Sequence, residues 1–228
     1  MVTAARRWIA IAGCALFATI GAPAEAKTDG QERVVERARL ALDSFLDDPN
    51  FEYMRVYVQN AYAVLVVPEM LKAGFIFGAE YGVGVLLVRD PQSGNWGQPA
   101  FYSLYGGSFG MQFGGSMADM VFTLMNERAV DKLISDKVKF GGDIEMALGR
   151  VGRGVGAGTT THFGEDVYAF SKSKGLFGGM SLEGTVVAPK HDWNEAYYGR
   201  PVDPMEIVRT PAGSRTDIAA LHQSLTRF

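Results

Sequence analysis

The sequence is poor in the residues that build covalent and metal-dependent sites. It has one cysteine, Cys14, and three histidines. A single thiol forms no internal disulfide, so the fold must rely on its hydrophobic core. Cys/His metal sites use about four such ligands, and Asp192 with Asn194 falls far short of the six to eight oxygens that calcium takes. We therefore expect neither a metal nor a cofactor.

Neither sign of charge dominates. The 22 Lys and Arg residues against 25 Asp and Glu give a net charge of -3 at pH 7. This balance lacks the basic footprint of a nucleic-acid-binding domain. Hydrophobic residues make up 47% and charged residues 21%, which is typical of a globular protein.

The first 26 residues have the pattern of a secretory signal peptide. Arg6 and Arg7 precede an apolar run over residues 8–22, and an A-x-A cleavage motif ends at Ala26. Cleavage there would leave one exported, periplasmic domain over residues 27–228. Two alternatives stay open. One is an uncleaved anchor, for which the run is short; the other is lipidation of Cys14, because "IAGC" resembles a bacterial lipobox.

Glycine is abundant, with 28 residues, and most of it falls between Gly74 and Gly199. Glycines interrupt β-rich segments such as "GFIFGAEYGVGVLLV" and "SKSKGLFGGMSLEG". Within strands, glycine marks bulges, bends or close backbone approach. The repeated pattern predicts an α+β fold: a strongly curved antiparallel sheet, as a sandwich or partial barrel, with flanking helices.

Local patterns place the helices and one buried strand. Apolar residues at three- and four-residue steps predict a helix over residues 29–48, ended by Pro49, and a second helix over 51–61. The next segment, "YAVLVVP", predicts a buried strand that ends at Pro68. Asn126 is expected to cap a helix in "NERAVDKLIS", "DWNEAYYG" is expected to form a helical turn, and the C-terminal segment is expected to end in a helix.

Several blocks resemble one known family. They are "KAGFIFG", "GVGVLLV", "FYSLYGGSFGMQFGG", "MNERAVDKLI", "KFGGDIEMALGRVGR" and "SKGLFGGMSLEGTVVAPKHDWNEAYYG". In this order they resemble the SYLF family, a lipid-binding domain also known as the Ysc-type actin-binding domain. The resemblance runs from about Arg33 to Val208.

The resemblance implies binding of phospholipids, notably phosphoinositides, and in some cytosolic members binding of actin beside SH3 or FYVE domains. This chain has an export pattern and no partner domain, so it resembles a bacterial exported branch and actin is not expected as a partner. The expected partner is a phospholipid or membrane surface. The alternative is a structural or protein-interaction module of the cell envelope.

Basic residues at strand spacing are the candidates for contact with lipid phosphate. A two-residue step places two lysines on one strand face, and glycine-rich backbone can join arginines around a phosphate. Each basic group near an anionic surface contributes about 1 kcal/mol. The candidates are Lys172, Lys174, Arg150, Arg153, Lys137 and Lys139, with Leu176 and Phe177 as apolar candidates for insertion. The alternative is solvated charge that protects strand edges from aggregation.

The sequence gives little support to an enzymatic function. "GGSFG" fits G-x-S-x-G with Ser108 as a nucleophile, but a nucleophile elbow needs a helix directly after the serine, and "GMQFGG" follows. "GRGVGAG" lacks the strand–turn–helix setting of a nucleotide-binding loop. We expect a non-enzymatic protein. A serine hydrolase is the third hypothesis, after lipid binding and a structural or protein-interaction module.

Overall fold

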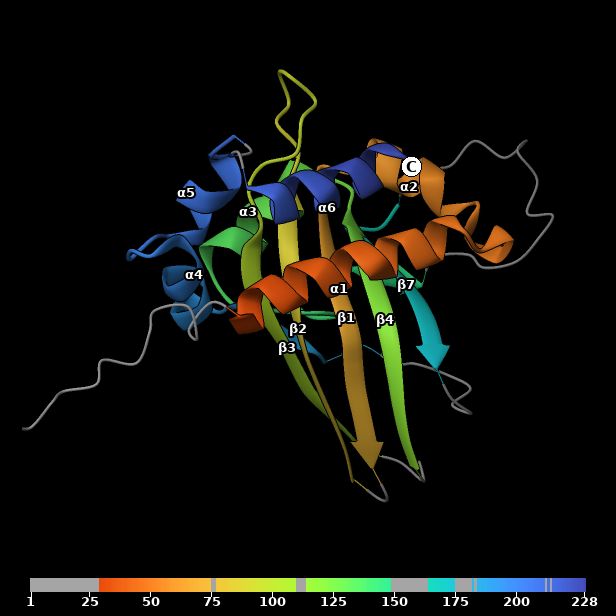
Figure 1. The fold of residues 1–228 in the computed structure, drawn as a ribbon. Coiled ribbons are helices and arrows are strands. Elements are labelled where there is room, and N and C mark those ends of the chain that lie inside the picture. Colours follow the sequence, from red (N-terminus) through yellow and green to blue (C-terminus); the bar gives the residue numbers. More distant parts are fainter. Residues whose placement is uncertain are drawn as a thin grey trace, which may run out of the picture.

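The computed structural model describes residues 29–74, 77–109, 114–148, 164–174, 182, 184–211, 213 and 215–228. These residues form six α-helices, one 3-10 helix and an eight-stranded sheet that curls into a half-barrel (Figure 1). The predicted α+β class with a strongly curved sheet is confirmed. The predicted signal peptide, residues 1–26, lies outside the described residues.

The sheet has the order β5-β8-β3-β2-β1-β4-β7-β6. Its strands are β1 (Ala63–Gly74), β2 (Phe77–Val88), β3 (Ala100–Phe109), β4 (Gly114–Leu124), β5 (Val138–Lys139), β6 (Met146–Leu148), β7 (Val167–Lys174) and β8 (Val186–Pro189). Neighbours pair antiparallel except β6 and β7, which pair in parallel. The sheet is therefore mixed, not wholly antiparallel as predicted, and the residues between β6 and β7 have the length that a parallel crossover needs.

Helices cover both faces of the sheet. One face carries α1 (Asp29–Leu46), the 3-10 helix η2 (Pro49–Phe51), α2 (Met54–Asn60), α4 (His191–Tyr198) and α6 (Thr216–Thr226); the other carries α3 (Glu127–Ser135) and α5 (Pro204–Arg209). The predicted helices are confirmed, with α2 shorter than expected. Asn126 caps α3 as predicted, since its Oδ1 accepts a 2.9 Å hydrogen bond from the amide of Ala129. No helix in the described part of the chain is long and apolar enough to cross a membrane.

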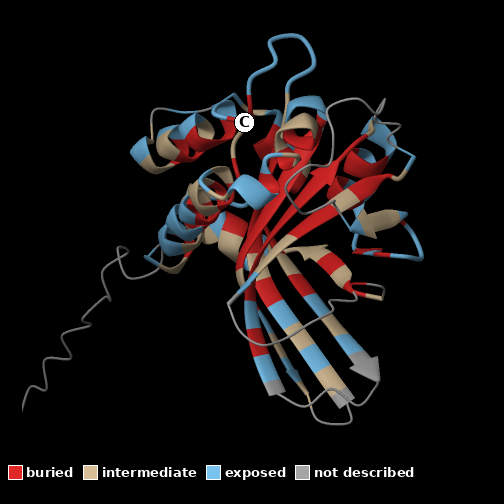
Figure 2. Cartoon of the chain, turned by 90° about the vertical axis from the view of Figure 1, so that its right-hand side faces the viewer, coloured by how far each residue is buried: buried red, intermediate tan, exposed pale blue. Residues whose placement is uncertain are grey.

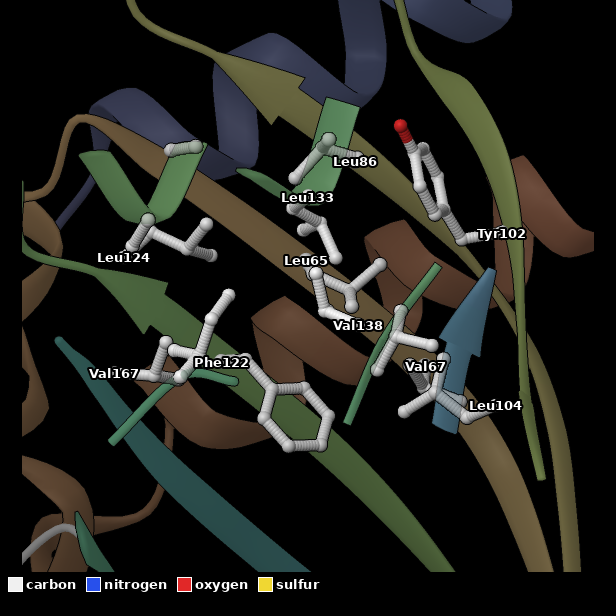
Figure 3. Close-up of a cluster of buried hydrophobic side chains, with 14 of the residues drawn as sticks. Leu65, Val67, Leu86, Tyr102, Leu104, Phe122, Leu124, Leu133, Val138 and Val167 are labelled. Atoms are coloured by element: carbon white, nitrogen blue, oxygen red, sulfur yellow. The ribbon is translucent and has the colours of Figure 1, made fainter. Parts of the chain in front are cut away.

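Two apolar layers hold the sheet. On the α1 face, Leu42 and Phe45 of α1 pack over strand residues such as Val66. On the opposite face, the layer includes Leu65, Leu86, Phe122 and Leu133 of α3 (Figure 3). The buried residues concentrate where helices cover the sheet, whereas beyond α1 the strands continue with exposed positions (Figure 2).

Strand β1 does not end at Pro68. It continues to Gly74, and its register shifts between Val67 and Met70 against β4, which marks a β-bulge. The prediction of a strand end was wrong because a proline without an amide hydrogen is tolerated at a bulge. Glu69, in the bulge, has a φ of 52° and is a non-glycine residue with positive φ.

Glycine permits close backbone approach in the middle of β2. A Cβ atom on Gly84 would lie 2.3 Å from the carbonyl oxygen of Val66. Such a contact is far inside van der Waals range, so the curved pairing of β1 and β2 requires glycine here. The prediction of close backbone approach at strand glycines is confirmed at this position.

Candidate functional site

A row of large exposed side chains crosses four neighbouring strands. Strand pairing places Tyr105 opposite Tyr81, Tyr81 opposite Leu71, and Leu71 opposite Met117. Their exposures are 42%, 51%, 49% and 39%. Paired residues of a sheet point to one face, so the four form one continuous strip.

The strip lies on the face that carries α1, beyond the part that helices cover. Phe101, Val85 and Val121 point to that face and are buried under the helices, and the strip lies four residues further along the same strands. Two residues further again, a parallel row of small exposed residues follows. It consists of Gly107, Ala79, Ala73 and Gly115. We call these two rows the distal face.

The distal face carries no charged side chain. Among the described residues at the ends of β1–β4, the charged residues are Lys72 and Glu80, which alternate onto the opposite face. There Lys72 Nζ lies 2.7 Å from Glu80 Oε2, with the two side chains 16% and 10% exposed. The hydroxyl of Thr185 also donates to Glu80. Their charges are thus satisfied away from the distal face.

A polar belt separates the distal face from α1. Arg37 of α1 forms an ion pair with Glu69 in the bulge. The amide of Glu69 donates a 3.0 Å hydrogen bond to Asp119 Oδ1. At the other end of the belt stands Lys172 of β7, which the register pairs with Asp119.

Lys172, a predicted lipid-binding residue, is engaged inside the fold. Its Nζ donates to the carbonyl oxygen of Ser44 at 2.8 Å and lies 3.1 Å from Asp48 Oδ2. Hydrogen bonds from the amide of Asn50 and from Lys172 lower the pKa of Asp48. A cation at the C-terminal turn of α1 also stabilises the helix dipole. The contacts give Lys172 a role in joining β7 to α1.

The other predicted site residues are placed as follows. The register pairs Lys174 with Met117, at the end of the exposed strip. Lys139 lies in β5, Lys137 lies directly before this strand, and both are exposed. Strand β5 is not a neighbour of β7 in the sheet. The structure therefore does not unite the two lysine pairs on adjacent strands. Arg150, Arg153, Leu176 and Phe177 lie outside the described residues.

Ser108 lies within a strand. It belongs to β3 and pairs with Gly78 in the ladder with β2. A nucleophile elbow requires the serine at a turn that opens a helix, which is not the setting of Ser108. In the described part of the chain, no cluster of three or more His, Cys, Asp or Glu side chains is arranged to hold a metal ion.

A second polar cluster ties the C-terminal helix to the rest. Tyr197 donates a 2.6 Å hydrogen bond to Asp217, and Arg215 reaches both Asp217 and Glu32 of α1. Burial opposes ionisation of Asp217, but the bonds from Arg215 and Tyr197 outweigh it and lower the pKa of Asp217. This cluster is structural, since its groups satisfy one another.

Sequence reasoning missed the distal face. In a regular strand Leu71 would share the face of Leu65 and Val67 and enter the core, whereas the bulge shifts it to the α1 face. A usable signal was present nonetheless. Residues 104–118 contain no charged residue, and residues 70–82 contain two.

The fold and its surface define a class of α+β domains in which a curved sheet with helices on both faces presents an uncharged outer strip. The chain belongs to the Ysc84 family, described as Las17-binding protein actin regulator, whose family model matches residues 105–228. The resemblance to the SYLF family is thereby confirmed.

Curated relatives come from yeasts and vertebrates. Protein YSC84 of Saccharomyces cerevisiae is 34% identical over 146 residues, covering 63% of this chain and 31% of the relative. The SH3 domain-containing YSC84-like protein 1 of Xenopus laevis is 31% identical over 166 residues, covering 72% and 49%. The chain therefore spans about a third to a half of these relatives. Their names describe YSC84-like or SH3 domain-containing proteins, not enzymes.

Proposed function

We propose that this chain is an exported, non-enzymatic phospholipid-binding domain. The observation that carries the proposal is the exposed strip of Tyr105, Tyr81, Leu71 and Met117. A soluble domain rarely exposes large apolar side chains side by side unless they contact a partner. Tyrosine suits the membrane interface, because its ring is apolar and its hydroxyl stays hydrated.

Basic residues supplement this strip. Lys137 and Lys139 are both exposed. Lys172 contributes less than the sequence suggested, since its ammonium group already has two partners. With about 1 kcal/mol for each basic group, a few exposed lysines add moderate affinity for anionic lipid.

The test is a vesicle-flotation screen with the full-length protein as expressed, and with its N-terminus measured by mass spectrometry. Vesicles contain phosphatidylcholine alone, phosphatidylcholine with phosphatidylserine, or phosphatidylcholine with a phosphoinositide. We expect the protein to float with at least one composition. Failure to float with any of them contradicts the function. An N-terminus at Lys27 would support export with cleavage, whereas an acylated Cys14 would identify a lipoprotein.

A second candidate is protein binding, favoured by the family description as an actin regulator. An exported protein does not meet actin, so within this candidate we favour a module of the cell envelope. Co-sedimentation with actin filaments tests the actin-binding function directly. A saturable pellet fraction together with absent flotation would replace the lipid proposal by the actin one.

A further inference from the structure

The distal end of the sheet has an unusual charge distribution. Over residues 70–82 and 104–118 the chain has two charged residues, Lys72 and Glu80. They form a largely buried ion pair on the opposite face. Within the described residues of β1–β4, this end of the sheet therefore exposes no unpaired charge; in the register the strip is flanked by Lys139 of β5, beyond Val186, and by Lys174 of β7.

The polar belt lies one row closer to α1 than the exposed strip does. Rows on one face of a strand are about 7 Å apart, because two residues separate them. In the belt, Arg37 pairs with Glu69, and Lys172 pairs with Asp48. The transition from two uncharged rows to internally paired charges thus occurs within about the thickness of a lipid headgroup layer.

We propose that the distal face inserts into the interface of a phospholipid bilayer, with the polar belt at headgroup level. The inference rests on the proposed function and adds the surface and the mode. The four side chains of the strip share one row, so all four would lie at the boundary between headgroups and acyl chains. This mode matches the depth of about 5–10 Å at which apolar faces enter membrane interfaces.

This mode has a distinct dependence on lipid charge. Because the belt's ion pairs are satisfied within the protein, they add little attraction for anionic lipid, and the inserted face contributes through apolar burial. Binding to phosphatidylcholine vesicles should therefore persist, and should change less than about threefold between low and high salt. Attraction through lysines and arginines would instead fall steeply with salt.

The decisive substitution is Leu71→Asp, with Leu40→Asp as its matched control. Leu71 is 49% exposed and Leu40, on α1 outside the distal face, is 51% exposed. Both changes introduce the same charge at a similarly exposed leucine. Placing a carboxylate in the inserted face should lower the vesicle partition coefficient about tenfold or more. Leu40→Asp should stay within about twofold of the wild type, and circular dichroism melting checks that both variants fold.

Leu71→Lys separates insertion from electrostatic attraction. Insertion predicts that lysine weakens binding to vesicles containing phosphatidylserine, as aspartate does. A peripheral electrostatic site predicts that the added lysine strengthens it. The inference is overturned if the wild type floats but Leu71→Asp binds equally well, or if Leu71→Lys binds more tightly. In either case the lipid-binding function itself stands, whereas a wild type that never floats removes both.

Sedimentation velocity tests the alternative that the distal face binds a second copy of the chain. The inserted mode predicts that Leu71→Asp leaves the oligomeric state unchanged. If the wild type is a dimer that dissociates on Leu71→Asp substitution, and vesicles do not compete with dimerisation, the distal face is an interface between copies and the inference is wrong.

Discussion

The ammonium group of Lys172 in β7 donates a 2.8 Å hydrogen bond to the main-chain carbonyl of Ser44, in the last turn of α1. The two residues are separated by 128 positions in the sequence. The contact joins a helix end to the sheet and satisfies a carbonyl that lacks a helical partner. A substitution at Lys172 is therefore expected to affect the stability of the fold.

Lys172→Ala should destabilise the protein. The substitution removes the bond to Ser44 and the ion pair with Asp48, both partly shielded from water. We expect a loss of about 1 kcal/mol in the free energy of unfolding, measured by urea denaturation. Lys137→Ala, at an exposed position, should stay within about 0.5 kcal/mol of the wild type. Equal stability of the two variants would show that Lys172 has no structural role.

The bulge in β1 allows a test of backbone strain. Glu69 has a φ of 52° and forms an ion pair with Arg37. Glu69→Ala removes the ion pair and keeps a side chain at positive φ, whereas Glu69→Gly also removes the ion pair but relieves the conformation. Glycine should therefore be the more stable of the two variants by about 1 kcal/mol. If alanine equals or exceeds glycine in urea denaturation, the strain is not significant.

The same bulge shows where prediction from sequence ends. Helix patterns, the cap at Asn126 and the glycine-broken strands were local, and they predicted the helices and the curved sheet correctly. The face of Leu71 was not predictable, because one bulge at Pro68 and Glu69 exchanges the two faces for the rest of β1. The partners of Lys172 were also not predictable, since they depend on contacts between distant segments.

The requirement for glycine in β2 is testable with a matched pair of substitutions. In Gly84→Ala, the new methyl group would meet the carbonyl oxygen of Val66 at 2.3 Å, so β1 and β2 must move apart. Gly107→Ala, on the distal face, would find Gly78 O at 3.6 Å, an ordinary contact. We expect Gly84→Ala to lower stability by about 1–3 kcal/mol and Gly107→Ala to be close to neutral in thermal melting. Similar melting temperatures for the two variants would contradict this account of the glycines.

Asp166 should make stability depend on acid pH. Burial opposes its ionisation, but hydrogen bonds from Asn126, Arg128 and the amide of Glu145 outweigh that effect and lower its pKa. A carboxylate with a folded-state pKa below the unfolded value contributes stability above the unfolded pKa of about 4, and loses it as the pH falls through the folded pKa.

Urea denaturation between neutral pH and pH 3 measures this contribution. The wild type should lose stability across the acid range, and Asp166→Asn should be less stable at neutral pH, by about 1–3 kcal/mol, with a shallower dependence on pH. The control is Asp131→Asn, the same substitution at an exposed position of α3. Because other carboxylates titrate in the same range, the difference in slope between the Asp166 variant and this control isolates the contribution of Asp166. Parallel curves for the two variants would assign the acid sensitivity to other groups.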